Sequence, residues 1–322
     1  MTTRYACLAG GVGAARFLRG LLRTVPAEDV TVVVNTADDD EIHGLPVSPD
    51  LDTVTYTLAG TENPHTGWGL AGDTFEATAA LARYGMPTWF RLGDRDIATH
   101  LFRAHCLREG KTLSGATAEI AAAWGVRARL LPMSDDRVRT VISVAGAENG
   151  ATADDGVTVE MAMQEWFVGQ RCEPAVRAVR FEGADTSTPA PGVLEALNAA
   201  ESVVVCPSNP VISIGPILAV PGIRETLARR REHVVGVSPI IGGSAVRGPA
   251  DRLMAALGME VSCAGVAAAY REFCGTLVID GIDAGHVGEI EALGVRAVVA
   301  DTVMRDTAVA AELARTALSA VA

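Results

Sequence analysis

The segment Ser48–Thr53 holds the carboxylates best placed for chemistry, because Asp50 and Asp52 flank a single leucine just after Pro49. Carboxylate oxygens suit hard cations such as Mg²⁺, which keeps several waters and binds through one or two carboxylates plus substrate phosphates. This pattern makes Asp50 and Asp52 candidates for a hard-metal site and for catalysis. A structural alternative stays open, since the same two residues could cap the N-terminus of a helix.

A second acidic run, Asp38-Asp39-Asp40, directly follows the β-branched run Val30–Val34. One acidic residue after a strand could bind a ribose, as in dinucleotide-binding folds, but three in a row exceed that need. A solvated acidic loop is the alternative.

Three glycine- or proline-containing turns, each after a predicted strand, could bring the backbone close to a phosphate. Gly10, Gly11 and Gly13 follow the strand Tyr5–Ala9 and open a helix, whose free N–H groups and positive dipole end favour an anion. Their spacing matches neither a dinucleotide-binding turn nor a Walker A loop, so a tight strand-to-helix turn is the alternative. The other two turns expose amides suited to a nucleotide base or phosphate, and they contain Ser208, Asn209, Gly242 and Gly243.

The segment Trp89–Asp96 combines aromatic, basic and acidic side chains. Arg91 could reach a phosphate or carboxylate while the nearby aromatic rings stack on a planar ligand. Asp94 lies in the same run, and surface ion pairs are the alternative for both residues. His100, one turn further on, fits a structural hydrogen bond better than a base.

These side chains need a scaffold, and the hydrophobic pattern predicts a three-layer, Rossmann-like α/β sandwich with a mainly parallel sheet. Strands alternate with helices at both ends of the chain, so we expect a nucleotide-binding core over residues 1–58 and 171–322. Residues 59–170 read as an inserted, mostly helical subdomain with a small β element. Ligands of open parallel sheets bind at the carboxyl ends of the strands, where these motifs lie.

Composition narrows the classes of function. The 322 residues carry a formal net charge of −12, which argues against a nucleic-acid-coating protein. The longest apolar stretch is broken by four prolines, so no membrane span is expected. No pair among the six cysteines has C-x-x-C spacing, and the N-terminus does not read as a secretory signal. We therefore expect a cytoplasmic protein with reduced thiols.

Several of these segments together resemble the 2-phospho-L-lactate transferases of coenzyme F-420 biosynthesis. The resemblance runs from the first strand to the last, and the Ala/Arg/Val-rich composition is similar to the actinobacterial branch, whose donor derives from phosphoenolpyruvate. The segments that carry it are Asn35–Ala37, Ser48–Val54, Leu92–Asp96 with Ala98–His100, Leu131–Asp136, Pro207–Pro210 and Ser238–Gly242.

The resemblance implies a reaction. A phosphoenolpyruvyl or 2-phospho-L-lactyl group would pass from its diphospho-5′-guanosine donor to the ribityl 5′-hydroxyl of the deazaflavin Fo, and GMP would leave. The product would be dehydro-F-420-0 or F-420-0. The resemblance also implies Mg²⁺ as cofactor and a homodimer.

The resemblance also implies roles for particular residues. Asp50 becomes the magnesium ligand, with Asp38 and Asp39 as further candidates for metal binding or for positioning the hydroxyl. Asp52, Arg91 and Asp94 become contacts to Fo. The nucleotide path takes Gly10, Gly11, Gly13, Ser208, Asn209, Gly242 and Gly243, with Arg16 supplying the basic group of the first loop.

Two alternatives remain. One is a non-catalytic regulator of the same superfamily that binds nucleotide sugars. The other is a dinucleotide-dependent dehydrogenase, which the glycine spacing disfavours.

Overall fold

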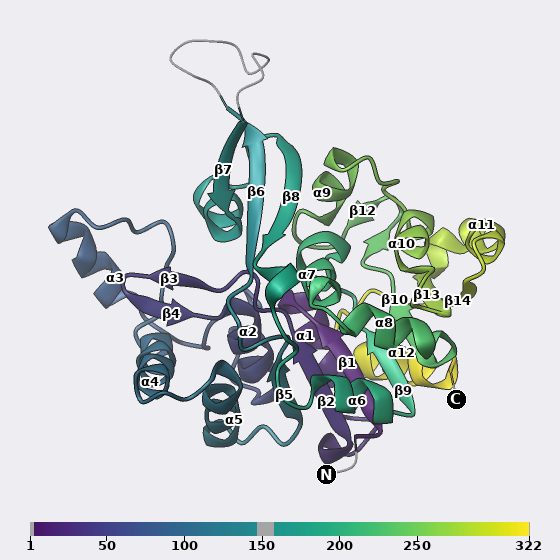
Figure 1. Ribbon diagram of the computed structural model, residues 1–322, viewed down its shortest axis with the longest axis horizontal. Coiled ribbons are helices and arrows are strands. Elements are labelled where there is room, and N and C mark those ends of the chain that lie inside the picture. Colours follow the sequence, from purple (N-terminus) through teal and green to yellow (C-terminus); the bar gives the residue numbers. More distant parts are fainter. Residues whose placement is uncertain (1–2, 147–157, 322) are drawn as a thin grey trace.

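The computed structural model describes residues 3–146 and 158–321 (Figure 1). Residues 1–2 and 322 of the predicted core, and 147–157 of the predicted insertion, lie outside the described residues. At the centre is a seven-stranded sheet in which every pair of neighbouring strands is parallel. Its order is β14 (Arg296–Ala300), β13 (Thr276–Asp280), β10 (Val234–Val237), β9 (Ser202–Val205), β1 (Tyr5–Ala9), β2 (Val30–Val34) and β5 (Arg129–Pro132).

Helices cover both faces of this sheet, because alternate side chains of each strand point to opposite faces. Cys7 and Ala9 of β1 pack on one side, and Ala6 and Leu8 pack on the other. The first layer comprises α1 (Gly11–Leu21), α2 (Pro49–Leu58), α5 (Leu113–Ala123) and α12 (Thr307–Ser319). The second comprises α6 (Val193–Ala199), α7 (Gly215–Ala219), α8 (Ile223–Arg229), α9 (Ala250–Ala256), α10 (Cys263–Tyr270) and α11 (Val287–Ala292). The predicted three-layer Rossmann-like fold is confirmed.

The strand order reverses at β1. The chain runs from β1 outward through β2 to β5, and later returns to place β9 on the other side of β1. Ligands of such sheets bind in the crevice at this switch point, beyond the carboxyl ends of the strands. The turns that follow Ala9, Val34 and Val205 therefore meet at one edge of the sheet.

Smaller elements extend from this edge (Figure 1). An antiparallel sheet has the order β7 (Thr158–Ala162), β6 (Arg139–Ala145) and β8 (Val176–Glu182). There are also two hairpins, β3 (Asp40–Ile42) with β4 (Leu45–Val47) and β11 (Ile240–Ile241) with β12 (Ser244–Ala245), and two further helices, α3 (Glu76–Leu81) and α4 (Asp96–Arg108). Short helical turns occur at η1 (Ala27–Asp29), η2 (Ala82–Tyr84), η3 (Glu165–Gly169), η4 (Ala184–Thr186), η5 (Pro210–Ile214), η6 (Arg231–His233) and η7 (Gly281–His286).

The predicted insertion 59–170 does not separate cleanly from the core. Strand β5 lies inside that range, yet it forms the edge of the main sheet beside β2. Strands β6 and β7 also lie inside it, but β6 pairs with β8 beyond its end. The run Arg129–Pro132 contains no β-branched residue, so the sequence carries little strand signal there.

In the part of the chain that the structure describes, no single helix has the length and apolar character to cross a bilayer. One pair of consecutive helical segments, Pro210–Ala219 and Ile223–Arg229, is long and apolar enough only when the two are taken together, and the chain bends by 93° between them. Its apolar side chains belong to the core beneath the sheet, which accounts for its composition.

Candidate functional site at the switch point of the sheet

Asp50 lies at the meeting point of two strand ends. It is in the first turn of α2, after Pro49, where it does not cap its own helix. Its Oδ1 accepts a hydrogen bond from the N–H of Gly11 at 2.8 Å, and its Oδ2 accepts one from the Asn35 side-chain amide at 2.9 Å. Burial raises the pKa of Asp50 to about 6, against the effect of both hydrogen bonds. A group held so far from water is costly in its charged form, which is typical of functional sites.

Asp38 is linked to Asp50 through Asn35, whose amide also donates to Asp38 Oδ2 at 3.0 Å. Burial and the nearby Asp50 charge raise the pKa of Asp38 well above its usual range, and burial does the same for Asp39. Ser48 donates to Asp39 Oδ2 at 2.6 Å. Asp38 is only 6% exposed, so the alternative of a solvated acidic loop is wrong for this residue.

These carboxylates fit a hard cation. Among the described residues, Asp38 Oδ1 and Asp39 Oδ1 are buried and have no hydrogen-bond partner, as a cation-facing oxygen would be. The three aspartates do not form a close cage, since the groups of three donor atoms that the described chain brings within 4.8 Å lie elsewhere. Mg²⁺ does not need a cage, because one or two carboxylates suffice when substrate phosphates and waters complete the shell.

Asp52 is directed to a different neighbourhood. Residues two apart on a helix do not share a face, and Asp52 forms a buried ion pair with Arg103 of α4. His100 Nδ1 lies 3.7 Å from Asp52 Oδ2, and Arg103 also donates to the carbonyl of Pro46 at 3.2 Å. His100 is thus a structural partner, as the sequence indicated. Arg103 was not singled out from the sequence, although its position three residues after His100 and seven after Asp96, on one face of a helix, was the available signal.

Arg91 and Asp94 lie in the segment between α3 and α4. The Arg91 guanidinium carbon stacks 4.0 Å from the centre of the Phe75 ring, and Arg91 is exposed. Asp94 accepts from the backbone N–H groups of Glu76 and Ala77 at 3.0 and 2.9 Å, which fixes the start of α3. A hydrogen bond from Thr74, with these two, lowers the pKa of Asp94. No ion pair or hydrogen bond among the described residues joins Arg91 or Asp94 to the Asp50 cluster.

The turn after β1 packs tightly against the turn after β9. The N–H of Gly10 lies 3.4 Å from Ser208 Oγ, and Asn209 Oδ1 accepts from the N–H groups of Val211 and Ile212, so it caps η5. A Cβ on Gly10 would stand 2.7 Å from the Cβ of Ser213. Ser208 and Asn209 are therefore beside the glycine turn, as the nucleotide path requires.

We expect Gly13→Ala to disturb this packing. A Cβ there would overlap the carbonyl oxygen of Pro207, which is backbone and cannot move aside cheaply. Overpacking of this kind costs about 1–3 kcal/mol of unfolding free energy. Chemical denaturation of Gly13→Ala measures that loss. Gly115→Ala in α5 is the matched control, because its Cβ meets nothing closer than 3.5 Å; an equal loss in both variants would contradict the expectation.

Gly242 and Gly243 form the tip of the β11–β12 hairpin, where their φ angles of +56° and +76° favour glycine. The N–H of Gly242 is already bonded to both Asp283 oxygens, at 3.0 and 3.1 Å. Among the described residues, no hydrogen bond joins these glycines to Asp50, Asn35 or Ser208. Their predicted part in nucleotide binding stays a prediction.

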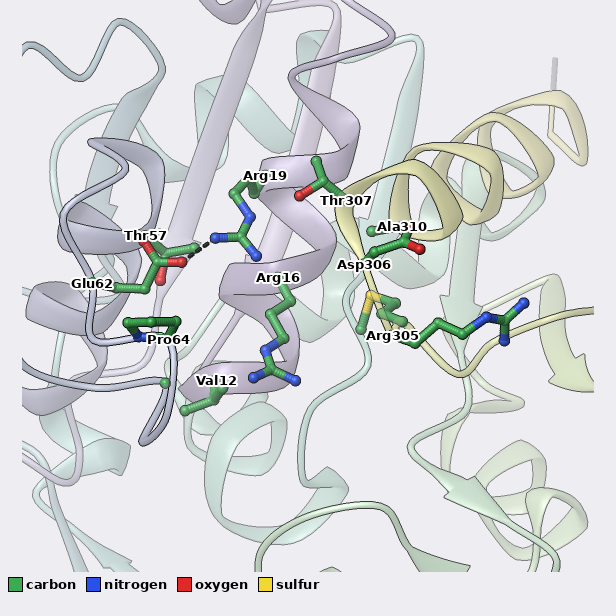
Figure 2. A pocket seen from close by; sticks show the side chains of 12 residues that line it. Val12, Arg16, Arg19, Thr57, Glu62, Pro64, Arg305, Asp306, Thr307 and Ala310 are labelled. Atoms are coloured by element: carbon green, nitrogen blue, oxygen red, sulfur yellow. Dashed lines mark hydrogen bonds and ion pairs between the residues drawn. The ribbon is translucent and has the colours of Figure 1, made fainter. Parts of the chain in front are cut away.

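A pocket of about 220 Å³ lies beside α1, against the N-terminal end of α12 (Figure 2). Figure 2 shows Arg16 reaching back along α1 toward Val12, while Arg19 pairs with Glu62 and Arg305 points away. Burial and the positive charges of Arg247 and Arg19 lower the pKa of Arg16. Val12 lines this pocket, and the preceding residue, Gly11, donates its N–H to Asp50. The pocket and the Asp50 carboxylate therefore both contact the first turn of α1.

A parallel sheet with a glycine turn, a helix N-terminus and buried carboxylates at its switch point defines the class: a Rossmann-like protein with its ligand site at the strand ends. The family model described as 2-phospho-L-lactate transferase CofD matches residues 6–316. The chain belongs to this transferase family, and it is an enzyme of this kind.

Individual relatives cover nearly the whole chain. A phosphoenolpyruvate transferase of Streptomyces griseus is 47% identical over 319 residues, 98% of this chain and 97% of the relative. A 2-phospho-L-lactate transferase of Methanosarcina mazei is 41% identical over 312 residues, 97% of this chain and 98% of the relative. A solved structure of a Bacillus halodurans protein, BH3568, covers 99% of this chain and 100% of its own, with a TM-score of 0.61 at 19% identity, which supports the fold alone.

Proposed function

We propose that this transferase acts in coenzyme F-420 biosynthesis and moves a phosphoenolpyruvyl or 2-phospho-L-lactyl group from its diphospho-5′-guanosine donor to the ribityl 5′-hydroxyl of Fo. GMP is the second product. The observation that carries the proposal is the family match over residues 6–316, with relatives named for both transferred groups. The phosphate-directed geometry around Gly11 and Asp50 supports it.

The donor diphosphate is proposed to lie across the N-terminus of α1. The helix presents its positive end there, and Gly10 and Gly13 let this turn pack directly against Ser213 and the carbonyl of Pro207. Arg16 adds a full charge beside the same turn, and no hydrogen bond or ion pair in the described chain occupies its guanidinium. The 220 Å³ pocket next to it offers room for part of the donor.

Asp50 and Asp38 are proposed to hold Mg²⁺, with Asp39 as a further candidate. When bound, the cation neutralises charge on the diphosphate and so favours departure of GMP. The Asn35 amide donates to both carboxylates and so holds them in place. Asp50 in turn accepts from the N–H of Gly11. The chain's own contribution is therefore to fix the positions of the turn and the carboxylates before the acceptor hydroxyl attacks in line.

Fo is proposed to contact Asp52, Arg91 and Asp94. Arg91 stacked on Phe75 offers a cationic and aromatic surface for a planar ring system. The buried ion pair between Asp52 and Arg103 joins α2 to α4 and so holds Asp52 in place.

We also propose that the protein is a homodimer in the cytoplasm. Light scattering after gel filtration tests the mass of the assembly.

The direct test incubates the protein with donor, Fo and Mg²⁺, and follows GMP by chromatography. We expect GMP release only when all three are present, and loss of turnover on chelation with EDTA. Mass spectrometry of the product from both donors in competition identifies the transferred group. Donor binding without GMP release, by a folded protein, would instead favour the non-catalytic regulator.

Arg16→Gln is expected to raise the KM for the donor about 10–100-fold, since hydrogen bonds to charged groups contribute about 1.5–3 kcal/mol. Steady-state kinetics with varied donor and saturating Fo measures the change. Arg23→Gln removes the same charge from the exposed segment beyond the other end of α1. If both variants behave alike, Arg16 does not contact the donor.

A further inference from the structure

A second set of metal-binding side chains lies in α10 and η7, outside the site built around Asp50. Cys263 Sγ, a carboxylate oxygen of Asp283 and a ring nitrogen of His286 all lie within 4.8 Å of one another. Cys263 and Asp283 are buried, at 1% and 6% exposure, and His286 is half-buried. The three residues come from two segments twenty positions apart in the chain, so the fold brings them together.

Cys263 begins α10, and the Asp283 carboxylate lies beside its sulfur. The N-cap residue of this helix, Ser262, accepts from the N–H of Gly265 at 2.9 Å. The backbone N–H groups of Cys263 and Ala264 are directed at the sulfur and favour its negative form. Burial and the Asp283 charge oppose this and raise the pKa of Cys263 to about 11. A bound cation would offset the repulsion from Asp283 and stabilise the thiolate as its ligand.

His286 is surrounded by negative charge. Its Nδ1 lies 2.9 Å from Glu289 Oε2, and the groups that raise its pKa are Glu289 first, then Asp283 and Glu260. Glu260, His286 and Glu289 form a second trio of donor atoms within 4.8 Å. A carboxylate on one ring nitrogen is the usual way to orient a metal-binding histidine, which leaves the other nitrogen for the metal.

We propose that Cys263, Asp283 and His286 bind a divalent transition-metal cation of the zinc class, with the fourth position open to water or to a neighbouring glutamate. A tetrahedral site with bonds of about 2.0–2.3 Å separates its donor atoms by roughly 3.3–3.8 Å. Donor atoms that already lie within 4.8 Å of one another therefore need to close by at most about 1.5 Å. Thiolate and imidazole select such a cation against Mg²⁺, which prefers oxygen ligands.

The site would fasten three segments of the carboxyl edge of the sheet. Cys263 starts α10, and Asp283 and His286 belong to η7 after β13. Asp283 also holds the tip of the β11–β12 hairpin through the N–H of Gly242. Occupancy is therefore expected to raise the melting temperature of the whole chain by binding only the folded state.

Cobalt titration of the metal-stripped full-length protein tests the proposal. We expect one equivalent of Co²⁺ to produce a thiolate-to-cobalt charge-transfer band in the near ultraviolet, to be displaced by Zn²⁺, and to resist millimolar Mg²⁺. Cys263→Ser should abolish the band. Cys106→Ser should leave it intact, since Cys106 is equally buried in α4 but belongs to neither trio. Absence of the band in the unmodified protein, or its survival in Cys263→Ser, would overturn the proposal.

If Cys263→Ser does not fold, substitutions of the more exposed residues His286 and Glu289 still test the proposal. His286→Ala should weaken Zn²⁺ binding at least about 10²-fold, and Glu289→Gln about 10–100-fold as the partner of a ligand. Competition with a chromophoric zinc chelator measures both affinities. Unchanged affinity in His286→Ala would mean that His286 and Glu289 form only a surface ion pair, and the site would be rejected.

Discussion

Asp50→Asn is expected to lower kcat for GMP release at least about 10²-fold while the chain remains folded. Asparagine has nearly the same size and keeps one oxygen that can accept from the N–H of Gly11. What it lacks is the negative charge that a cation would bind and the second oxygen, which accepts from the Asn35 amide. Steady-state kinetics at saturating donor, Fo and Mg²⁺ measures the loss.

The same variant should be at least as stable as the unmodified protein. Because the folded-state pKa of Asp50 is raised to about 6 from an ordinary 3.8, folding becomes less favourable as pH rises through that range. An uncharged asparagine removes this cost at neutral pH, which offsets the loss of the hydrogen bond from Asn35. Lower activity with equal or higher stability is the pattern expected of a residue kept for function.

Glu201→Gln provides the control for both measurements, because Glu201 forms an exposed ion pair with Arg4 just before the N-terminal ends of β9 and β1, away from the carboxyl edge of the sheet. Its turnover should not change. Near-normal turnover in Asp50→Asn would remove Asp50 from the mechanism. A large loss of stability would instead assign Asp50 a structural role.

Arg103→Ala is expected to destabilise the protein by about 3–5 kcal/mol, the usual cost of removing one partner from a buried ion pair. Arg103 is 2% exposed, and its loss leaves the Asp52 carboxylate buried without a counter-ion. The carbonyl of Pro46 loses its donor as well. Urea denaturation measures the change in unfolding free energy.

Matched variants distinguish the stability lost with the ion pair from the stability lost by truncating any arginine of α4. Arg108→Ala, on the exposed face of α4, should stay within about 0.5 kcal/mol of the unmodified protein. Asp52→Asn combined with Arg103→Met should recover part of the loss, because neither charge is then left alone. A loss below about 1 kcal/mol in Arg103→Ala would contradict a buried pair.

The Asp52 variants also test its proposed contact with Fo. If Asp52 touches the acceptor, Asp52→Asn raises the KM for Fo. The double variant Asp52→Asn with Arg103→Met then keeps this raised KM. If Asp52 acts only through Arg103, stability and KM recover together in the double variant. The comparison therefore distinguishes a substrate contact from a structural ion pair.

The sequence alone determined the layered fold and the edge at which the chemistry lies. The run Val30–Val34 is β-branched at every position and apolar at all but Thr31, a pattern typical of a strand covered on both faces. Residues directly after such strands must emerge at the carboxyl edge, so Gly10, Asp38 and Ser208 could be assigned to one rim before any contact was known. These inferences succeed because they depend on local periodicity.

Only the tertiary structure decided which side chains act together. Asp50 and Asp52 are neighbours in the sequence, yet helix geometry turns one toward Gly11 and Asn35 and the other toward Arg103. Strand β5 forms beside β2 although its own residues favour no strand, because β2 presents an open edge to pair with. Cys263 and His286 meet for a similar reason, since α10 packs against η7. Such pairings join segments far apart in the chain, and no local pattern encodes the distance between them.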